Sequence, residues 1–281
     1  MSKKNQKSIP PSINQAASTL SFDTLKLFKA SRKGGKKPVI DLFIENLTEI
    51  NKVTLTSSET ITGLLGLLGY VSAVEGYFRQ IFREIILFDQ YARKKCLSHD
   101  VSFGAALVVS QKAKAVDSLP EALLENVIFA SKKNITEAIK HYLDIKGNLP
   151  DELETALKEF EKICQLRHCA VHRYGQFGSQ NAIALGFDGH SKKIGFHICL
   201  ELEDLENIAT ICLNLVKVVN NFLFNKLLER SAKDLELWKD DYVKDKKLFK
   251  KYCAIFKPTN KTIGVTKHYK TLYNQFRNRY A

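Results

Sequence analysis

The sequence predicts an all-α fold with one small β-hairpin. Apolar residues recur at three- and four-residue intervals over most of positions 39–251, which is the pattern of amphipathic helices. Residue types that favour helix starts precede several of these runs, as at Pro150 and Asp151. Between residues 175 and 200 the pattern changes to two short apolar runs around an Asp-Gly pair, which is a hairpin signal. The composition, 44% hydrophobic and 26% charged, is that of a soluble globular protein.

Residues 1–38 are expected to form a basic, flexible N-terminal arm. A Pro-Pro pair (residues 10–11) opposes a helix, and a Gly-Gly pair (residues 34–35) interrupts regular structure in the basic linker. Only residues 22–30 have the pattern of a short amphipathic helix. The globular helical domain is expected over residues 39–245.

A long helix is expected to follow Thr56 and to run to about Lys95. Thr56 and Glu59 have the spacing of a capping box, in which two side chains satisfy each other's backbone amides. The glycines of this helix recur every third residue, at 63, 66 and 69, and so lie roughly on one side. We interpret them as a packing device that lets a neighbouring backbone come close.

The rest of the domain is expected to contain further helices with one interruption. Helical patterns cover residues 103–116, 120–143 with a break near Asn134, 151–175 and 203–251. The interruption is the expected β-hairpin, whose strands are residues 182–187 and 194–200. The final segment, residues 246–281, is expected to be a basic, aromatic C-terminal extension.

The positive charge of the chain is concentrated at its two ends. The net charge is +13, with nine Lys or Arg in residues 1–37 against Asp23 alone and ten in residues 246–281 against no acidic residue. The ends together hold +18, and subtraction leaves about −5 for residues 38–245. Basic ends attract polyanions, most obviously nucleic acid, through counterion release. The alternative is that they are solvated segments that only favour solubility.

The C-terminal extension alternates aromatic and basic side chains. Aromatic rings can stack on bases while cations contact phosphates, which is the combination that binds single-stranded nucleic acid. The candidate RNA-binding residues are Lys250, Lys251, Lys257, Lys261, Lys267, Arg277 and Arg279, and the aromatic residues are Phe249, Tyr252, Phe256, Tyr269, Tyr273, Phe276 and Tyr280. The competing interpretation is a terminal helix that packs on the body of the protein.

Other totals restrict the class of protein. The six cysteines have no regular spacing and the N-terminus lacks an apolar signal core, which predicts free thiols in a reducing, cytoplasmic setting. The longest uncharged apolar run, residues 61–74, is too short to span a bilayer, so we expect no membrane segment. The sequence has no Gly-x-x-x-x-Gly-Lys loop, no Gly-x-Ser-x-Gly elbow and no paired Cys-x-x-Cys, and no cofactor or metal is expected.

The candidate site is the segment 165–175, which contains two histidines and two arginines and ends at a glycine suited to a helix C-terminus. His172 can take a proton from a ribose 2′-hydroxyl or return one to a leaving 5′-oxygen. Arg167 can stabilise charge on the phosphate oxygens. On an ideal helix the two lie about 140° apart, and together they supply half of an acid–base site. A symmetric dimer would supply two copies of Arg167 and two of His172.

Three other interpretations of this segment stay open from the residues. Cys164, His168 and His172 are four residues apart on one helical face and could bind a metal ion such as zinc, although no fourth ligand is evident nearby. Cys169 could be a nucleophile beside a histidine, but adjacent helical residues diverge and no acyl-enzyme signature accompanies it. The simplest interpretation is an Arg-His run that caps the helix end.

The segment resembles the motif of HEPN-domain proteins, of the bacterial branch found in ribonuclease toxins and abortive-infection systems. That motif is an Arg, then four to six residues of which the first is usually polar, then a His. Here it extends from Arg167 to His172 within the longer form Arg-His-x-x-Val-His-Arg-x-Gly. Residues 71–79 also resemble the upstream helix of these domains, whose acidic residue is often near the site. The similarity covers roughly residues 57–225.

This resemblance implies a HEPN-like helical bundle, a homodimer whose interface forms the active cleft, and metal-independent RNA cleavage that leaves a 2′,3′-cyclic phosphate. It implies that Arg167 and His172 are catalytic. The supporting residues are His168, which contacts or orients the substrate, Glu75, Arg173 and Tyr174. The expected hairpin is an addition to a minimal bundle of this family.

The leading hypothesis is therefore an endoribonuclease, acting as a toxin or anti-phage abortive-infection effector, that gathers RNA with its basic ends. Its expected partners are RNA, a second copy of the chain, and an antitoxin or another defence-system protein. The second hypothesis is a non-catalytic nucleic-acid-binding or regulatory HEPN module. A third is that a nucleotidyltransferase partner modifies a tyrosine near the motif, for which Tyr174 is well placed.

Overall fold

The computed structural model describes residues 13–14, 21–28, 37–56, 59–111, 115–259 and 267–280. The chain forms two units, residues 1–35 and residues 36–281. The described part of the first unit contains a short 3-10 helix, η1 (Thr24–Leu27). This helix begins where the Asp23 carboxylate accepts a hydrogen bond from the backbone N–H of Leu25 at 3.1 Å. Most of the expected N-terminal arm lies outside the described residues.

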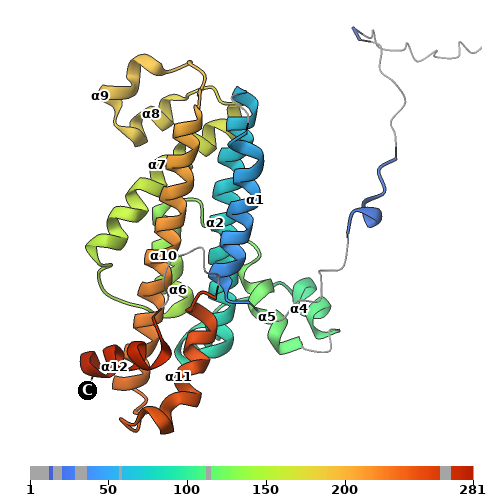
Figure 1. The fold of residues 1–281 in the computed structure, drawn as a ribbon. Coiled ribbons are helices and arrows are strands. Elements are labelled where there is room, and N and C mark those ends of the chain that lie inside the picture. The colour runs from blue at the N-terminus through green and yellow to red at the C-terminus, as the bar shows by residue number, and fades with distance from the viewer. Residues whose placement is uncertain are drawn as a thin grey trace, which may run out of the picture. The chain divides into compact units, whose positions relative to one another are not determined.

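The second unit is built from helices, which confirms the expected all-α class (Figure 1). The helices are α1 (Val39–Thr54), α2 (Thr60–Phe88), α3 (Gln90–Cys96), α4 (Phe103–Ser110), α5 (Ala115–Leu124), α6 (Lys132–Leu143), α7 (Asp151–Arg173), α8 (Ser179–Leu185), α9 (Phe187–His190), η2 (Ser191–Lys193), α10 (Leu202–Lys233), α11 (Tyr242–Phe256) and α12 (Tyr269–Tyr280). Within the described ranges no strand occurs, and one isolated antiparallel bridge joins Gln176 to His197.

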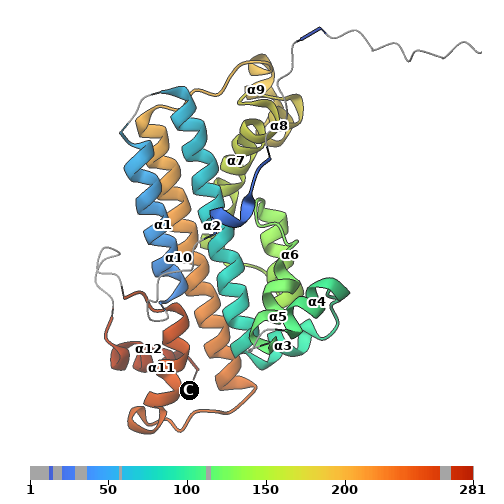
Figure 2. The ribbon, with the colours of Figure 1, turned by 90° about the vertical axis from the view of Figure 1, so that its right-hand side faces the viewer.

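Four long helices, α1, α2, α7 and α10, lie side by side and form the bundle of the second unit (Figures 1 and 2). Helix α2 is buried around much of its circumference because it packs against the other three at once. Its glycines permit this packing. A Cβ at Gly66 would lie 2.7 Å from Cγ2 of Thr54 on α1, and a Cβ at Gly63 would lie 3.3 Å from the backbone oxygen of Leu200. The predicted packing role is confirmed at both positions.

The helix expected between Thr56 and Lys95 ends earlier, because α2 stops before Asp89. The backbone there is extended, and the Asp89 carboxylate caps the new helix α3 by accepting a hydrogen bond from the backbone N–H of Ala92 at 2.9 Å. The expected capping box before α2 is also wrong. The Thr56 hydroxyl donates instead to the carbonyl of Val53, at the end of the preceding helix, at 3.0 Å. The sequence analysis thus identified a helix start near Thr56 with the wrong partner for its side chain, and it missed the break at Asp89.

The helices predicted over residues 103–116 and 203–251 are each divided, the first between α4 and α5 and the second between α10 and α11. In the second gap Glu236 and Asp240 take positive φ angles of 47° and 58°, which an α-helix does not accommodate. The apolar pattern continues through this gap because Trp238 packs into the core from the loop.

The β-hairpin predicted after the motif helix is wrong. Its first strand, residues 182–187, falls in α8 and the start of α9, and the Asp-Gly pair lies within α9. Ala182 and Leu185 are three residues apart, so one helical face brings both to an apolar cluster with Cys169 and Phe177. Burial of this face favours a helix over a strand.

The second predicted strand, residues 194–200, does take part in backbone pairing. The N–H of Phe177 donates to the carbonyl of Phe196 at 2.8 Å, and the N–H of Gly195 donates to the carbonyl of Phe177 at 2.9 Å. The chain that leaves α7 is therefore joined to the chain that enters α10. Residues 174–200, which connect these two helices, are called the insert below.

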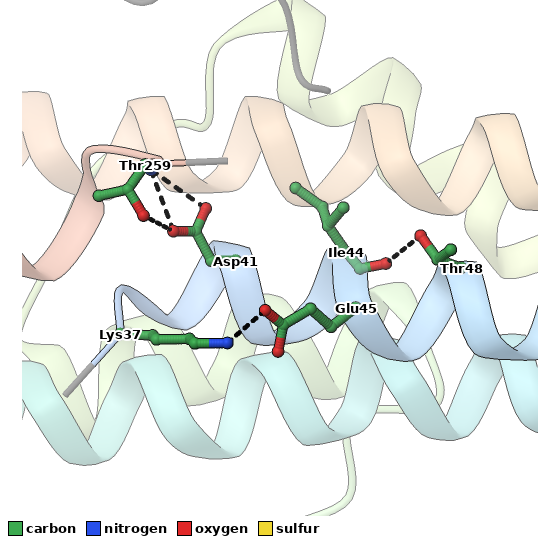
Figure 3. Close-up of polar contacts among 6 residues, drawn as sticks. All are labelled: Lys37, Asp41, Ile44, Glu45, Thr48 and Thr259. Atoms are coloured by element: carbon green, nitrogen blue, oxygen red, sulfur yellow. Dashed lines mark hydrogen bonds and ion pairs between the residues drawn. The ribbon is translucent and has the colours of Figure 1, made fainter. Parts of the chain in front are cut away.

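The C-terminal helices α11 and α12 pack against α10 at the end of the bundle opposite α8 and α9 (Figures 1 and 2). The buried Asp41 of α1 ties the segment after α11 to the bundle, because its carboxylate accepts hydrogen bonds from the backbone N–H of Thr259 at 3.0 Å and from the Thr259 hydroxyl (Figure 3). Lys37 and Glu45 form an exposed ion pair nearby at 2.6 Å. Residues 246–281, expected as an extension, belong to the same compact unit as the bundle wherever the structure describes them.

Two helices, α2 and α10, are long and apolar enough to cross a membrane by length and composition alone. In each, 56% of the most apolar window is buried inside the protein, as in the core helix of a soluble protein. Both helices pack against several others, which accounts for their apolar surface. They are a weak indication of a membrane span, and the cytoplasmic location stays a prediction.

Candidate functional site

Helix α7 carries the candidate site at its C-terminal end. Its first turn is acidic, with Asp151, Glu152 and Glu154, and its last turn contains His172 and Arg173. Both patterns match the helix macrodipole, which favours negative charge at the N-terminus and positive charge at the C-terminus. The dipole thus accounts for part of the Arg-His run without any catalytic role.

The helix stops where the backbone becomes left-handed. Tyr174 has a φ of 52° and Gly175 a φ of 88°, and the N–H of Gly175 donates to the carbonyl of Cys169 at 3.1 Å. A side chain at Gly175 would strain this backbone and would place a Cβ 3.1 Å from Cδ1 of Leu64 on α2. The predicted helix stop at Gly175 is confirmed, and the close approach fixes the end of α7 against α2.

Arg167 extends from α7 toward α2, where its guanidinium lies 4.0 Å from the carboxylate of Glu75. The other carboxylate oxygen of Glu75 accepts a hydrogen bond from the backbone N–H of Phe129 at 3.3 Å, so the carboxylate is held from two sides. The side chains of Arg167 and Glu75 remain 32% and 22% exposed. The guanidinium therefore lies near a carboxylate of opposite charge and is still accessible to a phosphate.

His168 and His172 lie one helical turn apart on an exposed face of α7. Their ring centroids are 4.5 Å apart, and the ring planes are tilted by 49°. Tyr174 follows at the helix end and is 73% exposed, while Arg173 lies 3.5 Å from the side-chain oxygen of Gln176. Both imidazoles can thus be reached by a phosphate ester from solvent.

Helix α7 runs without a break through both predicted catalytic residues. Arg167 and His172 therefore lie about 140° apart around the helix and about 7.5 Å apart along its axis. Arg167 faces Glu75 on α2, whereas His172 faces solvent beside His168. One chain does not direct both side chains to a common point. A site in which both act on one phosphate is completed most simply by a second copy of the chain.

A partly buried hydrogen-bond chain behind the site was not foreseen from the sequence. The side-chain amide of Asn181, a residue only 3% exposed, donates to the backbone oxygen of Gln165 at 3.2 Å and to its side-chain oxygen at 3.0 Å. Gln165 donates to Glu161 at 2.8 Å, and the other oxygen of Glu161 accepts from the backbone N–H of Lys132 at 2.7 Å. This chain joins the insert to α7 and α7 to α6. Its members are too far apart in sequence for a local pattern to identify them.

The hollows of the described surface include two that lie away from the motif. One, of ≈ 480 Å³, lies between α4 and α5 and is lined in part by Arg79 and Glu121. The other, of ≈ 470 Å³, lies between the start of α7 and α10 and is lined in part by Glu152 and Thr210. Neither is lined by a residue of the segment 165–175. The candidate site is thus a surface at a helix end, distinct from both hollows.

The geometry gives little support to the metal and nucleophile interpretations. Cys164 and Cys169 are buried, and burial raises the pKa of both thiols. Metal binding and nucleophilic attack both need the thiolate. Among the residues that the structure describes, no group of three or more His, Cys, Asp or Glu side chains is arranged to hold a metal ion.

The buried thiols should resist alkylation in the folded protein. Burial raises the pKa to about 12 for Cys212 and Cys253, whereas Cys199 is exposed. Because the thiolate is the reactive form, iodoacetamide at pH 8 should modify Cys199 at least about 10-fold faster than Cys212. Peptide mass spectrometry over a time course measures each rate, with a urea-unfolded sample as the control. Equal labelling of Cys199 and Cys212 in the folded protein would contradict this packing.

The C-terminal helices do not present the expected stacking surface. Five of the aromatic residues expected to stack on bases are buried in the core, namely Phe249, Tyr252, Phe256, Tyr273 and Phe276. Four of them pack around Trp238 and Phe256 packs against Phe224 of α10, because α11 and α12 cover the end of α10. These five rings are therefore not exposed for stacking on bases, and the competing interpretation, a terminal segment that packs on the body of the protein, is confirmed for α11 and α12.

The cations of the C-terminal segment have different surroundings. Four of them are exposed, namely Lys250, Lys251, Lys267 and Arg279. The Nζ of Lys257 lies 5.0 Å from the ring centroid of Tyr269, and Arg277 forms an ion pair with Asp240. Lys261 lies outside the described residues. The exposed members can contact phosphates without stacking. They lie at the end of the bundle opposite the motif (Figures 1 and 2).

Comparisons with known proteins identify no relative. No family model matches the chain, no curated protein matches it, and no solved structure matches its fold. Function therefore has to be argued from the candidate site itself.

Proposed function

We propose that the protein is a metal-independent endoribonuclease that uses Arg167 and His172. The observation that supports this most is the exposed histidine pair at the end of α7, with Arg167 lying near Glu75 of α2. An imidazole can transfer the protons of phosphate-ester cleavage, and a guanidinium can stabilise the charge of its transition state. The resemblance of this segment to the HEPN motif points to the same reaction.

In the proposed reaction, His172 takes the proton of a ribose 2′-hydroxyl and the 2′-oxygen attacks the adjacent phosphorus. Arg167 stabilises the charge that builds on the phosphate oxygens. The bond between phosphorus and the 5′-oxygen breaks, and His172 of the partner subunit gives a proton to the leaving oxygen. The products are a 2′,3′-cyclic phosphate and a 5′-hydroxyl. One proton is taken and one is returned, so the step balances without a further reactant.

The proposed homodimer follows from the directions of the two side chains. Arg167 and His172 of one chain diverge, whereas two copies related by a two-fold axis would place two histidines and two arginines around one cleft. A toxin or abortive-infection role, an antitoxin or defence-system partner and a cytoplasmic location belong to the same proposal, because they rest on the HEPN resemblance.

Product chemistry tests this reaction class. The parent protein is incubated in EDTA with a short labelled single-stranded RNA and with the same oligonucleotide carrying 2′-O-methyl groups throughout. The RNA should be cut to fragments with 2′,3′-cyclic phosphate ends, and the methylated strand should stay intact because its nucleophile is blocked. Cleavage that depends on added Mg²⁺, or fragments with 3′-hydroxyl ends, would overturn the proposal.

The second candidate is a non-catalytic nucleic-acid-binding module. The exposed Lys250 and Lys251 of α11 favour it, since cations alone bind polyanions through phosphate contacts. Under this candidate the parent leaves RNA intact, and replacing both lysines with glutamate lowers RNA affinity. Expression in a host cell separates the two candidates: growth arrest by the parent and by Arg167→Ala alike favours binding, and arrest by the parent alone favours catalysis.

A further inference from the structure

The insert (residues 174–200) presents exposed aromatic rings beside the candidate site. Tyr174 is 73% exposed, Phe196 59% and Phe187 52%, whereas five aromatic residues of α11 and α12 are buried. Exposed aromatic rings are typical of interaction surfaces. The exposed aromatic surface expected at the C-terminus is thus found next to the end of α7 instead.

The same part of the chain is cationic. Residues 165–200 contain four Lys or Arg, Asp188 as their only acidic residue, and four of the seven histidines of the chain. Lys192 and Lys193 are exposed, and Nζ of Lys193 lies 5.4 Å from the ring centroid of Phe196. A cation beside an aromatic ring is well placed to contact the phosphate of a nucleotide whose base stacks on that ring.

Backbone pairing holds Phe196 near the end of α7. The carbonyl of Phe196 accepts a hydrogen bond from the N–H of Phe177 at 2.8 Å, and the N–H of Ile198 donates to the carbonyl of Gly175 at 2.9 Å. Phe177 follows His172 by five residues, so the chain between them spans at most about 18 Å. A nucleic-acid strand that contacts Phe196 can therefore extend over His172.

We propose that the insert is a binding platform for single-stranded nucleic acid, in which a base stacks on Phe196 and Lys193 contacts its phosphate. This inference rests on the proposed ribonuclease function and deepens it, because it names an unpaired stretch of RNA as the substrate. Bases in a duplex are stacked on each other and offer no free face to Phe196, so the platform selects against duplex RNA.

Binding is measured by fluorescence anisotropy with a labelled single-stranded DNA, which lacks the 2′-hydroxyl and so reports binding apart from the proposed cleavage. Phe196→Ala should raise Kd about 10-fold, which corresponds to about 1.4 kcal/mol, because one stacked base is lost. Phe196→Tyr should restore binding. Lys193→Ala should reduce the slope of log Kd against log salt concentration by roughly one, because one phosphate contact is lost. Phe103→Ala, at an exposed phenylalanine of α4, is the matched control and should bind like the parent.

Equal affinities of the parent and Phe196→Ala would overturn the inference, as would a duplex bound as tightly as the single strand. A changed oligomeric state of Phe196→Ala with an unchanged Kd would also overturn it and would assign this ring to a contact between copies of the chain. Binding that depends on Phe196 without any RNA cleavage would support the platform and remove the ribonuclease proposal alone. Failure of the binding platform and failure of the ribonuclease proposal therefore give different results.

Discussion

Replacing His172 with alanine is expected to slow RNA cleavage by about 10³-fold, since a positioned general acid or base typically contributes 10²–10⁴-fold. His172 is exposed at the end of α7 and contacts the ring of His168, so its removal opens no cavity in the core. The unfolding curve of the variant should therefore coincide with that of the parent. Cleavage of a labelled RNA under single-turnover conditions measures the rate constant.

His268→Ala is the matched control for this substitution. His268 is also exposed, but it lies just before α12, at the end of the bundle opposite the motif. This variant should cleave RNA at the rate of the parent. His168→Ala should have an intermediate rate, because that residue is expected to contact the substrate and not to transfer the proton. If His172→Ala and His268→Ala cleave equally fast, His172 has no catalytic role.

Replacing Arg230 with methionine is expected to lower the free energy of unfolding by about 3–5 kcal/mol. Arg230 of α10 lies 2.6 Å from the Asp89 carboxylate, and the two side chains are only 11% and 8% exposed. Its second terminal nitrogen donates to the carbonyls of Leu143 and Asp144 at the end of α6, each at 3.0 Å. Methionine would leave a buried carboxylate without its cation. One side chain thus joins α10 to α6 and to the break between α2 and α3.

Urea denaturation measures this loss, provided that the denaturant slope is unchanged. Lys233→Met on the same helix is the matched control, because Lys233 pairs with Glu229 at 2.9 Å on an exposed surface, where ion pairs contribute little. The double variant Asp89→Asn/Arg230→Met should recover part of the stability, since the buried charge is removed together with its partner. A loss for Arg230→Met no larger than for Lys233→Met would rule out this role of the pair.

The bundle could be predicted because apolar periodicity is a local property of the sequence. The stripe of α2 that includes Val71, Phe78 and Ile85 is buried as expected. A helix break was missed where the deciding contact is distant: Asp89 ends α2 by capping α3, and it pairs with Arg230, 141 positions along the chain. No local window contains both residues.

The wrong hairpin in the insert and the base-stacking interpretation of the C-terminus have a common cause. Both predictions were made from residue types, but burial decided the outcome. Ala182 packs into a small apolar cluster and so belongs to a helix, and Phe249 and Phe276 cover the end of α10 instead of facing solvent. Whether an aromatic residue faces water depends on the tertiary fold, which the residue type alone does not determine.

The candidate site was predicted in part. The motif segment does form a helix end, and Arg167 does lie near Glu75, at 4.0 Å. The support that Asn181 gives to Gln165 could not be predicted, because it joins two segments through a buried amide. The catalytic roles of Arg167 and His172 remain part of the proposed function.

If RNA is the ligand, as proposed, the distance between the two cationic regions sets a condition on its length. The motif lies near the start of α10 and the basic helices α11 and α12 lie near its end (Figures 1 and 2). Helix α10 has 32 residues, which corresponds to a length of roughly 48 Å. An RNA that contacts both regions of one chain has to span a comparable distance, so short fragments should contact only one of them.

Incubation of total RNA in EDTA with the parent protein and with the double variant Arg167→Ala/His172→Ala tests the proposed chemistry most directly. Chelation removes divalent ions, so cleavage by acid–base catalysis is the reaction that is measured. The parent is expected to produce fragments with 2′,3′-cyclic phosphate ends, and the double variant, with an unchanged unfolding curve, is expected to leave the RNA intact. Intact RNA with the parent, or equal degradation by both proteins, would contradict the assignment of Arg167 and His172.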